Sequence, residues 1–175
     1  MAAVAVSAVV ANAAATSWKM AAANVYGADG ANKYSGSIYL FCSELTSASS
    51  VSTALSGKDS ASAVTAYLAG AALHTASASA GTVSNSLAAN QFATEELVAG
   101  NTYSFYYVFV DSDSYFMSAE KTGVIAQATS TVNIAFGNQQ SATQAAGNWT
   151  AVPEPTSGLL LLLGMAGLAL KRKRA

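Results

Sequence analysis

Alternation of apolar and polar residues predicts β-strands over most of the chain from residue 16 to residue 137. The longest alternating stretch spans residues 102–110, and it places four aromatic rings on one face because successive side chains of a strand point to opposite faces. These rings are Tyr103, Phe105, Tyr107 and Phe109. Shorter stretches of the same period predict further strands at residues 18–22, 37–43, 115–120 and 131–136.

The predicted strand at residues 37–43 carries apolar side chains on both of its faces. One face holds Ile38, Leu40 and Cys42, and the other holds Tyr39 and Phe41. A strand that is apolar on both faces is typical of the middle of a sheet, where neither face meets water. We therefore expect this strand to be central in the domain.

One segment has the period of a helix instead of a strand. Its apolar residues recur at i, i+3, i+4 and i+7, which places them in one stripe on a helix surface. They are Val64, Tyr67, Leu68 and Ala71. Asp59 or Ser60 can cap the start of this helix, and we expect it to run to about Leu73. The single histidine, His74, would then contact the last helix carbonyls.

The segments between these elements predict loops and turns. The serine-rich residues 46–57 predict a loop, and residues 75–90 predict a loop or a weak strand. Asp111 to Ser114 form a turn sequence, so the strands at 102–110 and 115–120 should pair as an antiparallel hairpin. We expect a mainly β fold: an antiparallel β-sandwich-like domain at residues 16–137 with one inserted helix, followed by a linker at residues 138–151.

A short sequence before the aromatic strand supports the sandwich. The residues are Leu97-Val98-Ala99-Gly100-Asn101-Thr102-Tyr103. This run is similar to the Leu-x-Pro-Gly-x-x-Tyr corner of fibronectin type III domains, with Ala99 in place of the proline. The resemblance implies an immunoglobulin-like sandwich in which the Tyr103 hydroxyl bonds back to the backbone upstream.

The four-ring face has two interpretations. Aromatic side chains in a row are most often part of a sandwich core, where each buries a large area. If the face is exposed instead, Tyr103, Phe105, Tyr107 and Phe109 form a platform on which sugars stack. The opposite face, with Tyr106, Val108 and Val110, is apolar too, so the pattern leaves both interpretations open.

Residues 1–15 have the composition of a secretory signal peptide. They are apolar and small, and they end in Ala-x-Ala patterns at Ala11/Ala13 and Ala13/Ala15. No basic residue precedes Lys19, so we expect the translation start to lie upstream of this methionine. The alternative is an alanine-rich helix buried in the domain.

The other end combines three features in a fixed order. Val152-Pro153-Glu154-Pro155 comes first, an apolar run from Leu159 to Leu170 follows, and Lys171, Arg172, Lys173 and Arg174 stand before the last residue. A helix over residues 157–170 would rise about 21 Å, less than the ~30 Å hydrocarbon core of a bilayer. The four bases would hold the tip on the cytoplasmic side. We expect a short C-terminal transmembrane helix at residues 157–170.

This order of features resembles the PEP-CTERM sorting signal that exosortases read, and the resemblance covers residues 152–175. It implies an exported bacterial protein that is first anchored in the inner membrane and then processed by an exosortase-type enzyme. It also implies an envelope with exopolysaccharide, which is a candidate partner. The alternative is an ordinary tail anchor without cleavage, for which Pro153-Glu154-Pro155 has no role.

Charge is distributed unevenly along the chain. The formal net charge is −1, but four of the eight bases lie in the C-terminal cluster, so residues 1–170 carry four bases against nine acids, a net charge of −5. A phosphate-binding surface needs a basic patch. The composition therefore argues against a nucleic-acid partner.

Few residues suit catalysis. Cys42 and His74 are the only cysteine and histidine, and the dense acidic pairs are Glu95-Glu96 and Asp111/Asp113, whose members are neighbours in sequence. Glycoside hydrolysis needs two carboxyl groups that face each other across a cleft. We expect no enzymatic activity, no cofactor and no metal. A structural or adhesive surface protein is the leading hypothesis, a noncatalytic polysaccharide-binding module is the alternative, and a hydrolase ranks third.

Overall fold

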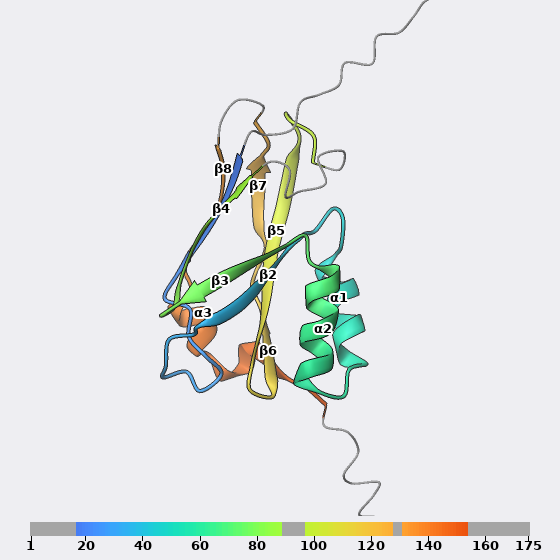
Figure 1. Cartoon of the computed structure of the whole chain (residues 1–175), viewed down its shortest axis with the longest axis vertical. Helices are drawn as coiled ribbons and strands as arrows, with labels where there is room; N and C mark the ends of the chain where they lie inside the picture. The colour runs from blue at the N-terminus through green and yellow to red at the C-terminus, as the bar shows by residue number, and fades with distance from the viewer. Residues whose placement is uncertain (1–16, 89–96, 128–130, 154–175) are drawn as a thin grey trace, which may run out of the picture.

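The computed structural model describes residues 17–88, 97–127 and 131–153, which form a curled sheet with the two longer helices packed on one side (Figure 1). The strands are β1 (Ser17–Ala23), β2 (Gly36–Cys42), β3 (His74–Ser79), β4 (Thr82–Ala88), β5 (Thr102–Asp111), β6 (Ser114–Met117), β7 (Lys121–Ile125), β8 (Thr131–Asn138) and β9 (Trp149–Ala151). The helices are α1 (Ala48–Ser56), α2 (Ala61–Ala71), α3 (Gln140–Gln144) and the 3₁₀ turn η2 (Ala146–Asn148). The prediction of a mainly β fold is confirmed.

The strands pair into one continuous sheet in the order β8-β1-β4-β3-β2-β5-β6-β9, and β7 pairs with the first half of β5. The predicted hairpin is confirmed, since Asp111 pairs with Ser114 and Val108 with Met117. The sheet is mixed, not antiparallel as expected, because β1 and β8 run parallel. Alternation fixes which face a side chain takes and leaves open which strand lies beside it, so the sequence pattern did not reveal this parallel pair.

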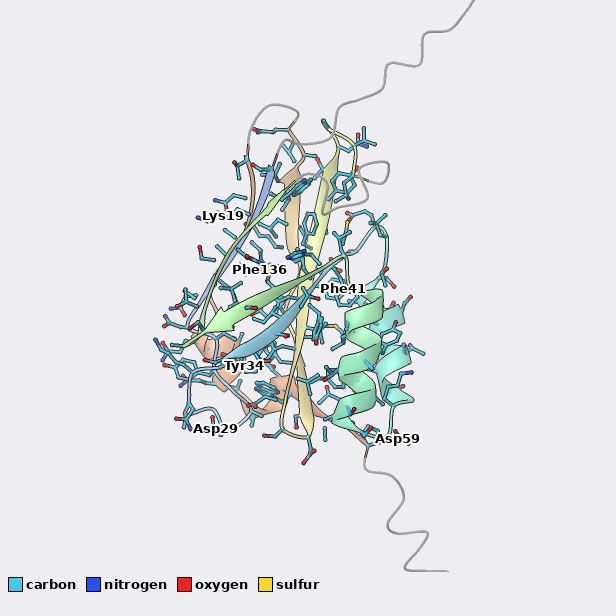
Figure 2. All side chains as sticks on the ribbon, viewed as in Figure 1. Lys19, Asp29, Tyr34, Phe41, Asp59 and Phe136 are labelled. Carbon is cyan, nitrogen blue, oxygen red and sulfur yellow. The ribbon has the colours of Figure 1, made fainter. Side chains whose placement is uncertain are left out.

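The core has two parts, one on each face of the sheet. The larger cluster fills the space that the curled sheet encloses, and the smaller one lies between the sheet and α1 and α2. Figure 2 shows Phe41 on the helix side and Phe136 on the enclosed side. The expectation for β2 is confirmed, since Ile38 and Leu40 enter the larger cluster and Tyr39 the smaller one.

The aromatic face of β5 belongs to the larger cluster. Phe105, Tyr107 and Phe109 are 0% exposed and Tyr103 is 6% exposed. Phe105 meets the edge of Trp18 with ring centroids 5.7 Å apart. The core interpretation of these rings is therefore right, and the sugar-stacking interpretation is wrong.

Both long helices begin at serine caps. The Ser60 hydroxyl accepts the Ala63 backbone N–H at 3.2 Å, which confirms the predicted helix, now bounded at Ala61–Ala71. The predicted loop at residues 46–57 is instead α1, capped by Ser47. Its stripe has only two large members, Val51 and Leu55, so serine-rich composition concealed it.

The sequence predicted that His74 lies at the end of the helix, and this prediction is wrong. His74 is the first residue of β3. The backbone leaves the helix at Ala72, and the His74 ring nitrogen Nε2 lies 3.3 Å from the side-chain amide of Asn85 on β4. Burial lowers the pKa of His74. Residues 75–90 are thus mostly the β3–β4 hairpin.

The corner before β5 has the geometry that its sequence predicted. The Val98 backbone N–H donates a hydrogen bond to the Tyr103 hydroxyl at 2.7 Å. This bond ties residues 97–101 to the start of β5, and Leu97 is itself buried in the larger cluster.

Residues 138–151, predicted as a linker, carry α3, η2 and β9. Thr143 is fully buried, and its hydroxyl accepts the Tyr26 N–H at 3.0 Å. Gln139 joins the core through its side-chain oxygen, which accepts the Tyr107 hydroxyl at 2.9 Å. The segment is therefore built into the domain.

Within the described ranges, no helix has both the length and the apolar character needed to cross a membrane. The predicted signal peptide at residues 1–15 and the predicted transmembrane helix at residues 157–170 lie outside the described residues.

We expect Phe105→Ala to lower the free energy of unfolding by about 3–5 kcal/mol, the usual cost of removing a buried phenylalanine ring. Chemical denaturation of residues 16–153 measures this loss. Ile125→Ala is the control, because Ile125 is 54% exposed and its removal should change stability by less than about 0.5 kcal/mol. Equal losses in the two variants would contradict the assignment of the β5 face to the core.

We expect Tyr103→Phe to lower the free energy of unfolding by about 1–3 kcal/mol, because the Val98 N–H loses its acceptor. Tyr67→Phe removes a hydroxyl from a half-buried ring on α2 and serves as the control. The same denaturation experiment compares them. A Tyr103→Phe protein as stable as the unmutated one would show that the corner bond contributes nothing.

Candidate functional site

The last strand of the domain lies against the hairpin turn and leads directly into the Pro-Glu-Pro sequence. β9 pairs antiparallel with β6, with Trp149 opposite Phe116 and Ala151 opposite Ser114. The next residue continues this register, because the Val152 N–H donates to the Asp113 carbonyl at 2.8 Å. The folded domain therefore extends to Val152.

β9 is anchored on both faces of the sheet. The Trp149 ring packs on Phe109 and Phe116, with centroids 5.2 and 5.6 Å away. Its indole N–H donates to the Thr143 carbonyl at 2.7 Å. On the other face the Val152 side chain is 5% exposed and belongs to the smaller cluster, beneath the helices. Pro153, the next residue, is exposed.

Only the start of the predicted sorting motif is described. Val152 and Pro153 lie at the end of the domain. Outside the described residues lie Glu154, Pro155, Lys171, Arg172, Lys173 and Arg174. Sequence reasoning missed β9, since three residues are too few for alternation to be visible, although Trp149 and Val152 stand at the spacing that places residues on opposite faces of a strand.

One acid of the hairpin pair, Asp111, supports the loop at residues 24–35, and Asp29 supports the same loop from within it. An Asp111 carboxylate oxygen accepts the Ala28 N–H at 2.7 Å, and the Asp29 carboxylate accepts the N–H groups of Ala31 and Asn32. The bonds to the Asn32 and Ala31 backbone lower the pKa of Asp29. Both acids line a polar cavity of about 230 Å³. Glu95 and Glu96, the other pair, lie outside the described residues.

A third carboxylate, that of Glu44, accepts hydrogen bonds from the start of β5 and the end of β2. Glu44 accepts the Ser104 N–H with both oxygens, at 2.9 and 3.0 Å, and accepts the Cys42 thiol at 3.2 Å. Burial acts to raise the pKa of Glu44, but these donors outweigh it and the pKa falls below its usual range. Burial raises the pKa of Cys42 to about 12. The thiol is therefore protonated at neutral pH and is a poor nucleophile.

The arrangement offers few ligands for a metal. In the described ranges, no three His, Cys, Asp or Glu side chains gather closely enough to hold an ion. The carboxylates that the structure does place together accept backbone N–H groups, which makes them supports for loops.

Comparison with known proteins identifies a motif in the C-terminal part of the chain. The family model of the PEP-CTERM protein-sorting motif matches residues 151–174. No curated protein and no solved structure matches the chain. The match begins at Ala151, the last residue of β9, and it confirms the resemblance that the sequence showed. The C-terminal part of the chain thus carries a PEP-CTERM sorting motif, which supports sorting by an exosortase-type system.

Proposed function

We propose that the protein is a noncatalytic structural or adhesive component of the cell surface or extracellular matrix, exported and delivered by its sorting signal. The observation that carries the proposal is the junction at Val152, where a folded β-domain passes directly into the sorting motif. The domain is therefore the part that sorting would deliver.

The roles of the polar side chains support a noncatalytic domain. Asp29, Asp111 and Glu44 each accept backbone N–H groups, and such bonds hold loops in place. Glu120 accepts the Ser43 hydroxyl at 2.7 Å, and His74 lies against Asn85. These groups are used for the fold itself.

The outer face of the curled sheet supports a surface role. Every second side chain of β3 is exposed on this face, and so are two side chains of β4. The exposed residues are Thr75, Ser77, Ser79, Thr82 and Ser84. The helices α1 and α2 cover the other half of the sheet, around β2 and β5 (Figure 1). Small hydroxyl side chains on a broad face suit contact with a hydrated polymer matrix, because each is a hydrogen-bond donor and acceptor.

The alternative of a polysaccharide-binding module has lost its main support. It depended on Tyr103, Phe105, Tyr107 and Phe109 as a stacking platform, and these rings are in the core. Exopolysaccharide remains a proposed partner only through the outer hydroxyl face.

The sorting signal should be removed from the mature protein. We expect material recovered from the cell surface to lack residues 159–175, because the processing enzyme separates the domain from its membrane segment. Intact-mass measurement identifies the C-terminus. A chain with Glu154→Ala and Pro155→Ala is the control and should keep its full length. A mature mass that includes the final Lys-Arg-Lys-Arg-Ala would contradict the proposal.

The basic cluster should hold the signal in the membrane during sorting. We expect replacement of Lys171, Arg172, Lys173 and Arg174 by glutamine to reduce the processed fraction, because a polar tip without positive charge is no longer retained on the cytoplasmic side. Cell fractionation and immunoblotting measure that fraction. Lys171→Arg with Lys173→Arg keeps the charge and should be processed normally. Equal processing of the glutamine variant would count against this role.

A further inference from the structure

The attachment of β9 bears on where the chain can be cut. Trp149 fixes the strand on the enclosed side of the sheet and Val152 fixes it on the helix side. We call these two contacts the β9 clamp. β9 is an edge strand of three residues, so little else would keep it on β6 if the clamp were lost.

The backbone of this segment is already engaged. The residues of β9 are paired with β6, and the Val152 N–H is bonded to the Asp113 carbonyl. Enzymes that act on peptide chains commonly bind an extended segment through its backbone groups, as an added strand. Alternate residues of an antiparallel strand point their backbone groups to the neighbouring strand, so Thr150 and Val152 face β6 whereas Trp149 and Ala151 face outward. An enzyme that needs the groups facing β6 therefore cannot bind residues 149–152 while the clamp holds.

We propose that Val152 and Trp149 are positioning residues that confine processing to the chain beyond Pro153, so that the mature protein keeps β9. This inference rests on the proposed sorting. Processing breaks one peptide bond: its acyl carbon passes to an acceptor, water or an amine, and the proton that the acceptor loses goes to the leaving nitrogen. The clamp takes no part in that step, and it decides which bonds the enzyme can reach.

A disulfide that locks β9 onto β6 tests the proposal. Because Asp113 and Val152 are joined by a hydrogen bond, the next pair, Ser114 and Ala151, is a non-hydrogen-bonded pair. The Cα atoms of such a pair lie about 4.5 Å apart, which a disulfide can span. Ser114 is half-buried and Ala151 is exposed, so Ser114→Cys with Ala151→Cys disturbs no core contact.

The full-length chain with this disulfide is produced in cells that contain the exosortase-type enzyme. We expect the same mature C-terminus as in the unmutated chain, beyond Pro153, and no loss of processing, because the strand need not open. A block of processing in the locked chain would overturn the proposal, as would a mature C-terminus at or before Val152 in the unmutated chain. If the unmutated chain is not cut at all, the proposed sorting fails and this inference fails with it.

A second variant removes one contact of the β9 clamp, that of Trp149. This residue lies outside residues 151–174, which the sorting-motif model matches. Trp149→Ala removes the contacts with Phe109 and Phe116. We expect additional mature C-termini before Val152, seen as smaller masses. Ile134→Ala is the control, since Ile134 is fully buried in β8 and its loss weakens the domain without touching β9. A single unchanged C-terminus in Trp149→Ala, or the same new masses in both variants, would show that the clamp does not position the cut.

Discussion

Burial of β5 on both faces is the constraint on which the rest of the structure depends. The face of β5 that carries Phe105 packs in the larger cluster, inside the curled sheet. The face that carries Tyr106 packs against α1 and α2. One edge of the strand pairs with β2, and the other pairs with β7 and then with β6. Because alanine and serine fill much of the chain, these aromatic rings supply a large share of the apolar area that folding removes from water.

The same strand connects the core to the sorting signal. β6 lies beside β5, and β9 lies beside β6. The last strand of the domain therefore lies directly against the β5–β6 hairpin. Trp149 packs on Phe109 of β5, and Val152 enters the cluster that also holds Tyr106. The stability of the core and the position of the sorting motif therefore depend on the same contacts.

Residues with a strong local pattern were predictable, and residues whose role depends on distant partners were not. The rings of β5, the Ser60 cap and the Tyr103 corner follow from spacing of two to five residues. The parallel pairing of β1 with β8 joins residues more than a hundred positions apart, and no local pattern encodes it. At the candidate site, the motif at Pro153 can be recognised from the sequence, whereas the position of Val152 depends on its bond to Asp113, which is distant in the sequence.

Amide hydrogen exchange of the full-length chain tests the central claim, that the folded domain reaches Val152. The Trp149–Ala151 strand and the Val152 amide lie on β6, so the account predicts that the Val152 amide is protected to a degree similar to the β6 amides. Exchange of the Val152 amide at the rate of an unfolded chain, while β5 and β6 stay protected, would contradict it.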